Sequence, residues 1–198
     1  MVGARTYPIP IVRMIDLDKL GILSEEEADR GEEDGLEGNH QYRDLRGIDW
    51  HQVEAALYEE AELFRRFAAA ADIDAEAELY EEEREEADFP EDDFWGLDVG
   101  VIGATLALSA LGAVPVYSCN AGGFGGAHAA AFPHVTFFLP RQNASEVLGV
   151  AVEADVGLDL VEGGIARLYG QTDFDLHRFA EHAVRRHRPQ KDQSQEQS

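Results

Sequence analysis

The spacing of apolar residues predicts three helices in the first 112 residues. After Asp49, a residue type that caps helix N-termini, apolar side chains recur at intervals close to three and four until about Ala71. Residues 74–87 also have a helical pattern, but the run EEEREE leaves little apolar face and is typical of a solvated helix or a linker. Residues 92–112 are apolar nearly all round, which predicts a buried helix that ends at Gly112.

Short runs rich in apolar and β-branched residues predict strands. Residues 114–118 and 135–139 flank a loop rich in glycine. Residues 158–169 contain two further runs around a Glu-Gly-Gly turn, which is the pattern of a hairpin. Residues 9–15 alternate after two prolines, and this favours an additional strand at a sheet edge, where proline is tolerated.

Two more helices are expected after the second strand. Asn143 has a glutamate three residues further on, which is the spacing of a capping box, and begins a helix that stops by Gly157. Asp173 is expected to cap the last helix, whose final turn carries basic residues that suit a helix C-terminus. Two histidines of this helix do not share one face and are expected at the surface: His177 and His182.

The remaining segments divide the chain into three parts. Residues 24–39 are acidic and punctuated by glycine, which predicts a mobile loop. We expect an acidic, mainly helical extension over 1–90, a domain over 91–188 and a disordered polar tail over 189–198. The fold class expected for the domain is α+β, or α/β, with a small mixed sheet packed by helices.

The charge of the chain limits its partners. Forty acidic residues face sixteen basic ones, giving a formal net charge of −24, which disfavours binding to duplex nucleic acid or to an anionic membrane. Fourteen of the sixteen basic residues are arginine. This composition suits a protein of a high-salt cytoplasm, and the alternative is a GC-rich genome combined with an acidic linker. In either case stability should rise with salt, because salt screens self-repulsion.

The single cysteine, Cys119, excludes an internal disulfide and a zinc site of several cysteines. The first twenty residues have no apolar signal-peptide core, and the longest apolar stretch, 99–117, is interrupted by glycine and proline. We therefore expect a soluble cytoplasmic protein without a membrane partner.

Residues 114–139 concentrate the side chains that could carry chemistry. Two apolar runs flank a loop that begins after Cys119. Within fifteen residues after that cysteine lie four glycines, the aromatic Phe124 and two histidines: Gly122, Gly123, Phe124, Gly125, Gly126, His128 and His134. We expect the functional site in this loop.

A cysteine nucleophile is the first hypothesis for the loop. Cys119 stands at the end of a predicted strand, where a rigid element would hold it at an exposed tip, and Ser118 and Asn120 flank it. His128 would serve as the base and His134 as a second base or an orienting group, while glycine N–H groups would hold an oxyanion. The alternative is a buried cysteine that acts as a small hydrophobic residue, which is the commoner fate of a lone cysteine.

An anion-binding loop is the second hypothesis, because the amides of AGGFGG can converge on a phosphate or carboxylate. The segment matches neither the P-loop nor the G-x-G-x-x-G pattern, and no lysine or arginine lies between Val114 and Pro140. The alternative is a tight turn that needs glycine for its backbone angles.

Metal binding by Cys119, His128 and His134, with Asp98 as a further ligand, is the third hypothesis. These ligand types suit zinc or iron, but their spacing matches no known motif, so we predict no metal and identify no cofactor. Asp98 otherwise complements the first turn of the buried helix or orients a histidine of the loop.

The loop also carries a resemblance. The segments FWGLDVG, ALSALGAVPVYSCNAGGFGGAH and FPHVTFF resemble a group of uncharacterised prokaryotic proteins that share an S-C-N-x-G-x-F-G-G-x-H loop, and this resemblance implies no established activity. Residues 117–122 are more faintly similar to the Ser-Ser-Cys-Ser-Gly-Arg segment of tRNA wybutosine-synthesis methyltransferases, which lies at their substrate and cofactor site. This chain lacks the arginine and is strongly acidic, so no activity is carried over.

Two functions follow from the sequence. The first is a small-molecule or catalytic site between Ser118 and His134, with the cysteine and histidines as the reacting groups. The residues expected to contact a ligand are Ser118, Asn120, Gly122, Gly123, Phe124, Gly125, Gly126 and Asp98. The second is a non-enzymatic interaction protein, in which the glycine loop is structural and the acidic helices bind a basic protein or a second copy of the chain.

Overall fold

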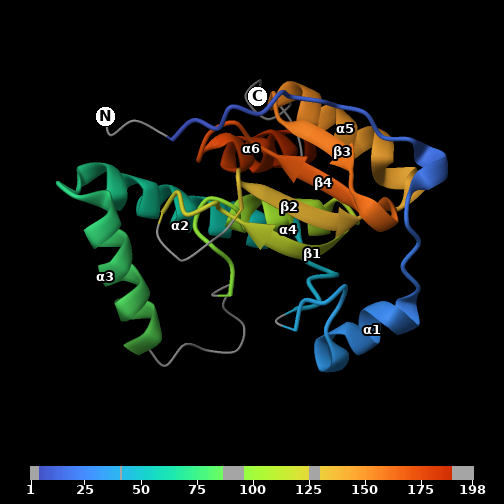
Figure 1. Ribbon diagram of the computed structural model, residues 1–198, viewed down its shortest axis with the longest axis horizontal. Helices are drawn as coiled ribbons and strands as arrows, with labels where there is room; N and C mark the ends of the chain where they lie inside the picture. The colour runs from blue at the N-terminus through green and yellow to red at the C-terminus, as the bar shows by residue number, and fades with distance from the viewer. Residues whose placement is uncertain (1–4, 41, 87–95, 125–129, 189–198) are drawn as a thin grey trace, which may run out of the picture.

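The computed structural model of the chain describes residues 5–40, 42–86, 96–124 and 130–188. Within these residues four strands form one sheet in the order β1-β2-β4-β3 with antiparallel neighbours, and helices pack against it, which confirms the α+β class (Figure 1). The strands are β1 (Val114–Cys119), β2 (His134–Phe138), β3 (Gly157–Leu160) and β4 (Ala166–Tyr169).

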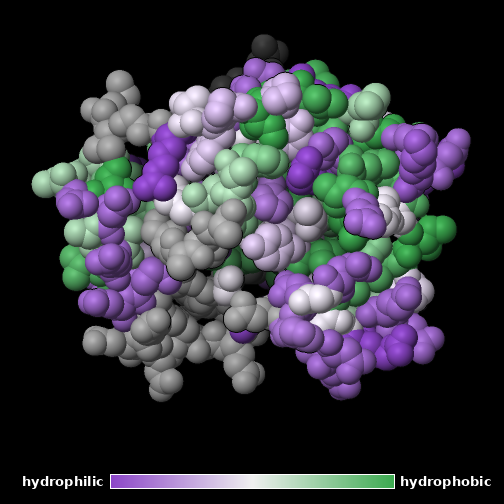
Figure 2. Space-filling model, in the orientation of Figure 1, coloured by the Kyte–Doolittle hydropathy of each residue, from purple (hydrophilic) through white to green (hydrophobic). Residues whose placement is uncertain are grey.

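The described helices are α1 (Glu25–Asp34), α2 (Trp50–Ala69), α3 (Ile73–Glu86), α4 (Ile102–Ala110), α5 (Ala144–Glu153) and α6 (Asp175–His187), with short 3₁₀ turns at Leu17–Lys19, Arg141–Asn143 and Glu162–Gly164. α4, α5 and α6 pack on one face of the sheet, and α2 packs on α4 and α6 from the side away from it (Figure 1). α1 and α3 lie at opposite ends of the molecule (Figure 1), and hydrophilic side chains gather over α1, whereas hydrophilic and hydrophobic side chains are mixed over the end that holds α3 (Figure 2). None of the described helices is both long and apolar enough to cross a bilayer.

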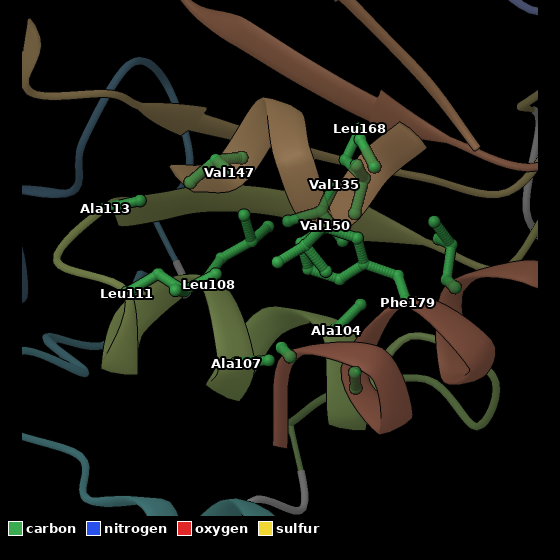
Figure 3. Packing of buried hydrophobic residues seen from close by; sticks show 14 of the residues in the cluster. Ala104, Ala107, Leu108, Leu111, Ala113, Val135, Val147, Val150, Leu168 and Phe179 are labelled. Carbon is green, nitrogen blue, oxygen red and sulfur yellow. The ribbon is translucent and has the colours of Figure 1, made fainter. Parts of the chain in front are cut away.

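The hydrophobic core lies between the sheet and these helices. Alternate strand residues such as Val135 and Leu168 point into it and are fully buried, because successive side chains of a strand face opposite sides (Figure 3). Leucine, valine and alanine side chains of α4 and α5 and Phe179 of α6 meet them. Val53 and Leu57 of α2 belong to the same cluster, so the predicted extension and the predicted domain share one core.

Two predicted helix ends are confirmed in detail. Asp49 caps α2 by accepting a hydrogen bond from the Gln52 N–H (2.9 Å), and the Gln52 side chain accepts one from the Asp49 N–H (3.0 Å). Gly112 follows α4 with a φ of +82°, a conformation that favours glycine. The N–H groups of Gly112 and Ala113 then satisfy carbonyls of the last helical turn.

The prediction of a mobile loop over residues 24–39 is wrong, because most of it forms α1. Ser24 accepts a hydrogen bond from the Glu27 N–H, and the Glu27 carboxylate accepts one from the Ser24 N–H, which makes a capping box. The helix docks through Gly31, where any side chain would collide with the ring of Tyr42. Local capping and one close contact thus outweigh the polar composition.

The predicted start of α4 is also corrected. The described chain makes turns at residues 96–101, and the helix begins only at Ile102, without a cap from its own preceding side chain. The predicted caps at residues 92 and 93 lie outside the described residues.

Two predicted caps serve other elements instead. Asn143 makes no capping bond to α5, because its side chain donates to the Leu111 carbonyl (2.8 Å) beyond the end of α4. Asp173 does not cap α6, which begins at Asp175 after Phe174. The Asp173 carboxylate accepts hydrogen bonds from the N-terminal segment.

The N-terminal segment runs along the edge of the sheet at β3. The Leu158 N–H donates to the Val12 carbonyl (2.8 Å), and the Met14 N–H donates to the Leu158 carbonyl (3.0 Å). This pairing forms a single parallel bridge at Arg13 rather than a full strand, so the predicted edge strand at 9–15 is present only as a bridge. The segment covers the backbone groups that the edge strand β3 would otherwise expose.

Candidate functional site

The described part of the glycine loop is a tight turn fixed to the segment before α4. Ala121 and Gly122 have φ angles of +58° and +73°, as the central residues of a type I′ turn require, and the Gly123 N–H donates to the Asn120 carbonyl (3.2 Å). The Asn120 side chain accepts from the Gly122 N–H (2.8 Å) and donates to the Val99 carbonyl (3.0 Å).

Two residues predicted to bind a ligand therefore hold the loop in place. Asn120 is buried, and both ends of its amide are bonded within the protein. The Asp98 carboxylate accepts from the Asn120 backbone N–H (3.3 Å). Ser118 is half-buried in β1. The bonds of Asn120 and Asp98 favour a structural role at the loop, the alternative named above for its glycines.

Cys119 lies at the end of β1, as predicted, but its side chain is fully buried rather than exposed at a tip. Its Sγ accepts a weak hydrogen bond from the Ala121 N–H (3.4 Å). Cys119 and His134 are direct cross-strand neighbours in the β1–β2 ladder, so the structure does bring these two predicted residues together.

His134 is oriented by its own chain. Its Nδ1 lies 3.1 Å from the Phe132 carbonyl oxygen, and the tautomer that suits this contact carries the proton on Nδ1. Burial is the main cause that lowers the pKa of His134, and the Arg167 guanidinium lowers it further, while the Phe132 carbonyl opposes both. His134 is therefore neutral at neutral pH. The predicted residues Gly125, Gly126 and His128 lie outside the described residues.

A cavity of about 390 Å³ opens beside the loop, where α2 turns into α3. Four phenylalanine rings, several small side chains, one arginine and three aspartates line it: Arg5, Phe64, Phe67, Ala68, Ala71, Asp72, Ile73, Asp74, Gly123, Phe124, Asp173 and Phe174. Of the predicted site residues that the structure describes, Gly123 and Phe124 contribute to this wall and the others do not.

The phenylalanines form one contact cluster around Phe124. Its ring stacks on Phe67 with centroids 5.6 Å apart and meets Phe64 at 5.0 Å and Phe174 at 5.6 Å. Phe124 is only 6 % exposed, so it anchors the loop on the helices while its neighbours Phe64 and Phe174 remain partly exposed. Aromatic pairs of this geometry add to the stabilisation from buried area.

Charged groups form the rim of the cavity. The Arg5 N–H donates to Asp173 Oδ2 (2.7 Å), and the Arg5 guanidinium bonds to the Gly122 carbonyl and to Asp74 Oδ1 (3.1 Å). The Tyr7 hydroxyl donates to Asp173 Oδ1 (2.8 Å), and burial together with this carboxylate raises the pKa of Tyr7. A side chain at Gly123 would collide with Asp173, so this glycine is required for the close approach of loop and rim.

Comparisons with protein-family models, with curated proteins and with solved structures find no match to this chain. Its function is inferred from the geometry of the site alone.

Metal binding receives no support from the described geometry. In the parts of the chain that the structure describes, no three histidine, cysteine, aspartate or glutamate side chains are grouped so that they could hold a metal ion. One of the ligands considered in the metal hypothesis, His128, lies outside those parts.

One buried carboxylate beside the site was not predicted. Glu60 of α2 is fully buried and accepts hydrogen bonds from the N–H groups of Gly100 (2.9 Å), Ile102 (3.1 Å) and Gly103 (3.3 Å), so it caps α4 from another helix. The predicted surface position of His177 is wrong, because its Nδ1 bonds to Glu60 Oε2 (2.6 Å) and its ring packs against Phe64.

A sequence signal for Glu60 existed. It occupies the apolar stripe of α2, three residues after Leu57, where a charged side chain is buried only if it is paired.

Proposed function

We propose that this protein binds a small, largely apolar molecule in the cavity between the glycine loop and the α2–α3 corner. The observation that supports this most is the lining of the cavity by four phenylalanine rings together with a few charged groups at one rim. A volume of about 390 Å³ lies within the range of small-molecule sites, which are typically apolar with a small number of polar groups that fix orientation.

The described part of the glycine loop, residues 120–124, supports binding because its contacts hold it in place. Its turn is held by the Asn120 side chain, and Gly123 lets the chain approach Asp173 so closely that Phe124 reaches the helices. A wall of this kind is formed before the ligand arrives, so little conformational entropy is lost on binding. Catalysis by Cys119 receives less support, because a buried thiol is not positioned to attack a substrate in the cavity.

Blocking the cavity with a bulky side chain tests this proposal. Ala68 and Ala69 are adjacent and exposed at the end of α2, but only Ala68 lines the cavity. We expect ligand-observed NMR with small aromatic probes to detect binding to wild type and to Ala69→Trp with a dissociation constant below about 1 mM, and loss of binding in Ala68→Trp.

The thermal unfolding midpoint of each variant shows that it is folded. Equal binding to both tryptophan variants, or no binding of any aromatic probe to the wild type, would overturn the proposal.

A further inference from the structure

We infer that the ligand of this cavity is a small organic cation with an apolar body. This inference rests on the proposed function and concerns the class of its ligand. Among the described residues the ionisable groups at the rim are unbalanced, because three carboxylates (Asp72, Asp74 and Asp173) face one guanidinium (Arg5), a sum of −2. The whole chain carries −24, which further raises the local concentration of cations around it.

The contacts of Arg5 show that groups at the rim can hold a positive charge. Its guanidinium bridges the Gly122 carbonyl of the loop and the Asp74 carboxylate of α3, so hydrogen-bond acceptors from both sides of the cavity already converge on a cation. Both groups that bond to this guanidinium, the Gly122 carbonyl and the Asp74 carboxylate, are hydrogen-bond acceptors. An ammonium or guanidinium group of a ligand meets the same acceptors.

The bridge made by Arg5 is easily displaced. The side chains of Arg5 and Asp74 are 47 % and 76 % exposed, and ion pairs in water contribute little to stability. A ligand cation that is held partly out of water competes well with such a pair. Arg5 therefore acts as a resident cation that a ligand replaces, and its removal leaves Asp74 free for the ligand.

The aromatic walls favour the same charge. The faces of phenylalanine rings carry negative potential, and a cation within about 6 Å of a ring centroid is attracted to it. Phe64 and Phe174 contact each other edge to face at 4.9 Å and are partly exposed, so an apolar body and its attached cation can both contact rings. Of the described lining residues, the phenylalanine faces and three carboxylates would oppose an anion, and Arg5 alone would favour it.

Three matched probes test the charge: 2-phenylethylammonium, the neutral 2-phenylethanol and the anionic phenylacetate have the same ring and nearly the same size. We expect titration by NMR at low salt to give the tightest binding for the ammonium, by about tenfold over the alcohol, and the weakest for phenylacetate. The preference should shrink as salt is added.

Variants at the rim locate the effect. Arg5→Gln should tighten the binding of 2-phenylethylammonium, and Asp74→Asn should bring it close to that of the alcohol. Glu78→Gln removes the same charge from an exposed position of α3 that does not line the cavity, and it should leave the preference unchanged.

Tightest binding of phenylacetate, weakened by Arg5→Gln, would overturn the inference of a cation and retain the small-molecule site. Equal binding of the three probes would overturn it in the same way. Failure of all three to bind would instead overturn the proposed function itself.

Discussion

Two of the hydrophobic clusters of this protein differ in composition and in closure. The main core beneath the sheet is built largely of leucine, valine and alanine, and side chains such as Val135, Leu158 and Leu168 are fully buried. The cluster at the glycine loop is aromatic, and it joins the buried Phe67 and Phe124 to the partly buried Phe64 and Phe174. Only the second cluster borders the cavity and its charged rim.

This difference indicates that one part of the fold stabilises the protein and another part is suited to bind a ligand. In a close-packed aliphatic core every methylene group adds to the stability of the fold, because it fills space and is removed from water. Rings that meet at angles leave room between them, and the same rings offer both contact area and a negative face to a ligand. The aromatic cluster, which is only partly buried, therefore lies beside the charged rim of the cavity.

Truncating one phenylalanine in each cluster tests this separation most strongly. Phe179→Ala removes a fully buried ring from the main core and should lower the free energy of unfolding by about 3–5 kcal/mol. Phe174→Ala removes a partly exposed ring from the cavity wall and should cost at most about 2 kcal/mol. Urea unfolding in high salt measures both, and equal losses would contradict the separation.

Glu60 joins the two clusters, because it caps α4 of the core and bonds to His177 beside Phe64. Glu60→Gln should lower the free energy of unfolding by about 2–4 kcal/mol, since the amide cannot replace a carboxylate that accepts three N–H bonds and an imidazole bond. The matched variant Glu59→Gln, at an exposed neighbour, should change it little. Chemical unfolding of the two proteins gives the comparison.

The turn at the loop stores a smaller amount of strain. Ala121 has a φ of +58°, which is unfavourable for a residue with a Cβ, so Ala121→Gly should raise the free energy of unfolding by roughly 0.5 kcal/mol. Ala75→Gly, in the exposed part of α3, should lower it by about 0.5–1 kcal/mol. If thermal unfolding gives changes of opposite sign in the free energy of unfolding, the effect of glycine depends on the backbone angles at each position. A loss of stability in both variants would contradict this.

The smallest expected effect concerns pH. The pKa of His134 is lower in the folded protein than the ordinary value of 6.5, so the unfolded chain binds more protons as pH falls below 6.5 and the folded state loses stability there. His134→Gln should therefore reduce the decline of stability between neutral pH and the lower folded pKa. His51→Gln, at an exposed position of α2, provides the control and should leave the slope as it is in the wild type.

Elements with a strong local pattern were predictable. α2, α3, the two strands around the loop and the hairpin of β3 and β4 follow from apolar spacing and turn residues alone. α1 was missed because only Ala28 and Gly31 of its ten residues are buried, so it has almost no apolar periodicity. The residues of its capping box are visible in the sequence, but the polar composition of the segment favoured the prediction of a loop.

The caps and the cavity depended on partners far along the chain. Asn143 and Asp173 are good cap residues, but each side chain finds a partner elsewhere, in Leu111 or in the N-terminal segment. The cavity draws its wall from four separate segments around residues 5, 64–74, 123 and 173. The pattern along the sequence does not show which distant segments come together in the fold. The loop could therefore be predicted from its glycines, but the part of the wall formed by α2 and α3 could not.

The N-terminal segment that runs along β3 can pair only after its distant partners in the chain have been synthesised. The Arg5 N–H bonds to Asp173, 168 residues later in the chain, and the pairing at Val12 waits for Leu158. At about 5–20 residues per second, a ribosome needs roughly 10–30 s to supply these partners. During translation Arg5 and Val12 therefore remain without these partners until residues 158–173 have been made, and both the sheet edge and the cavity rim are completed only then.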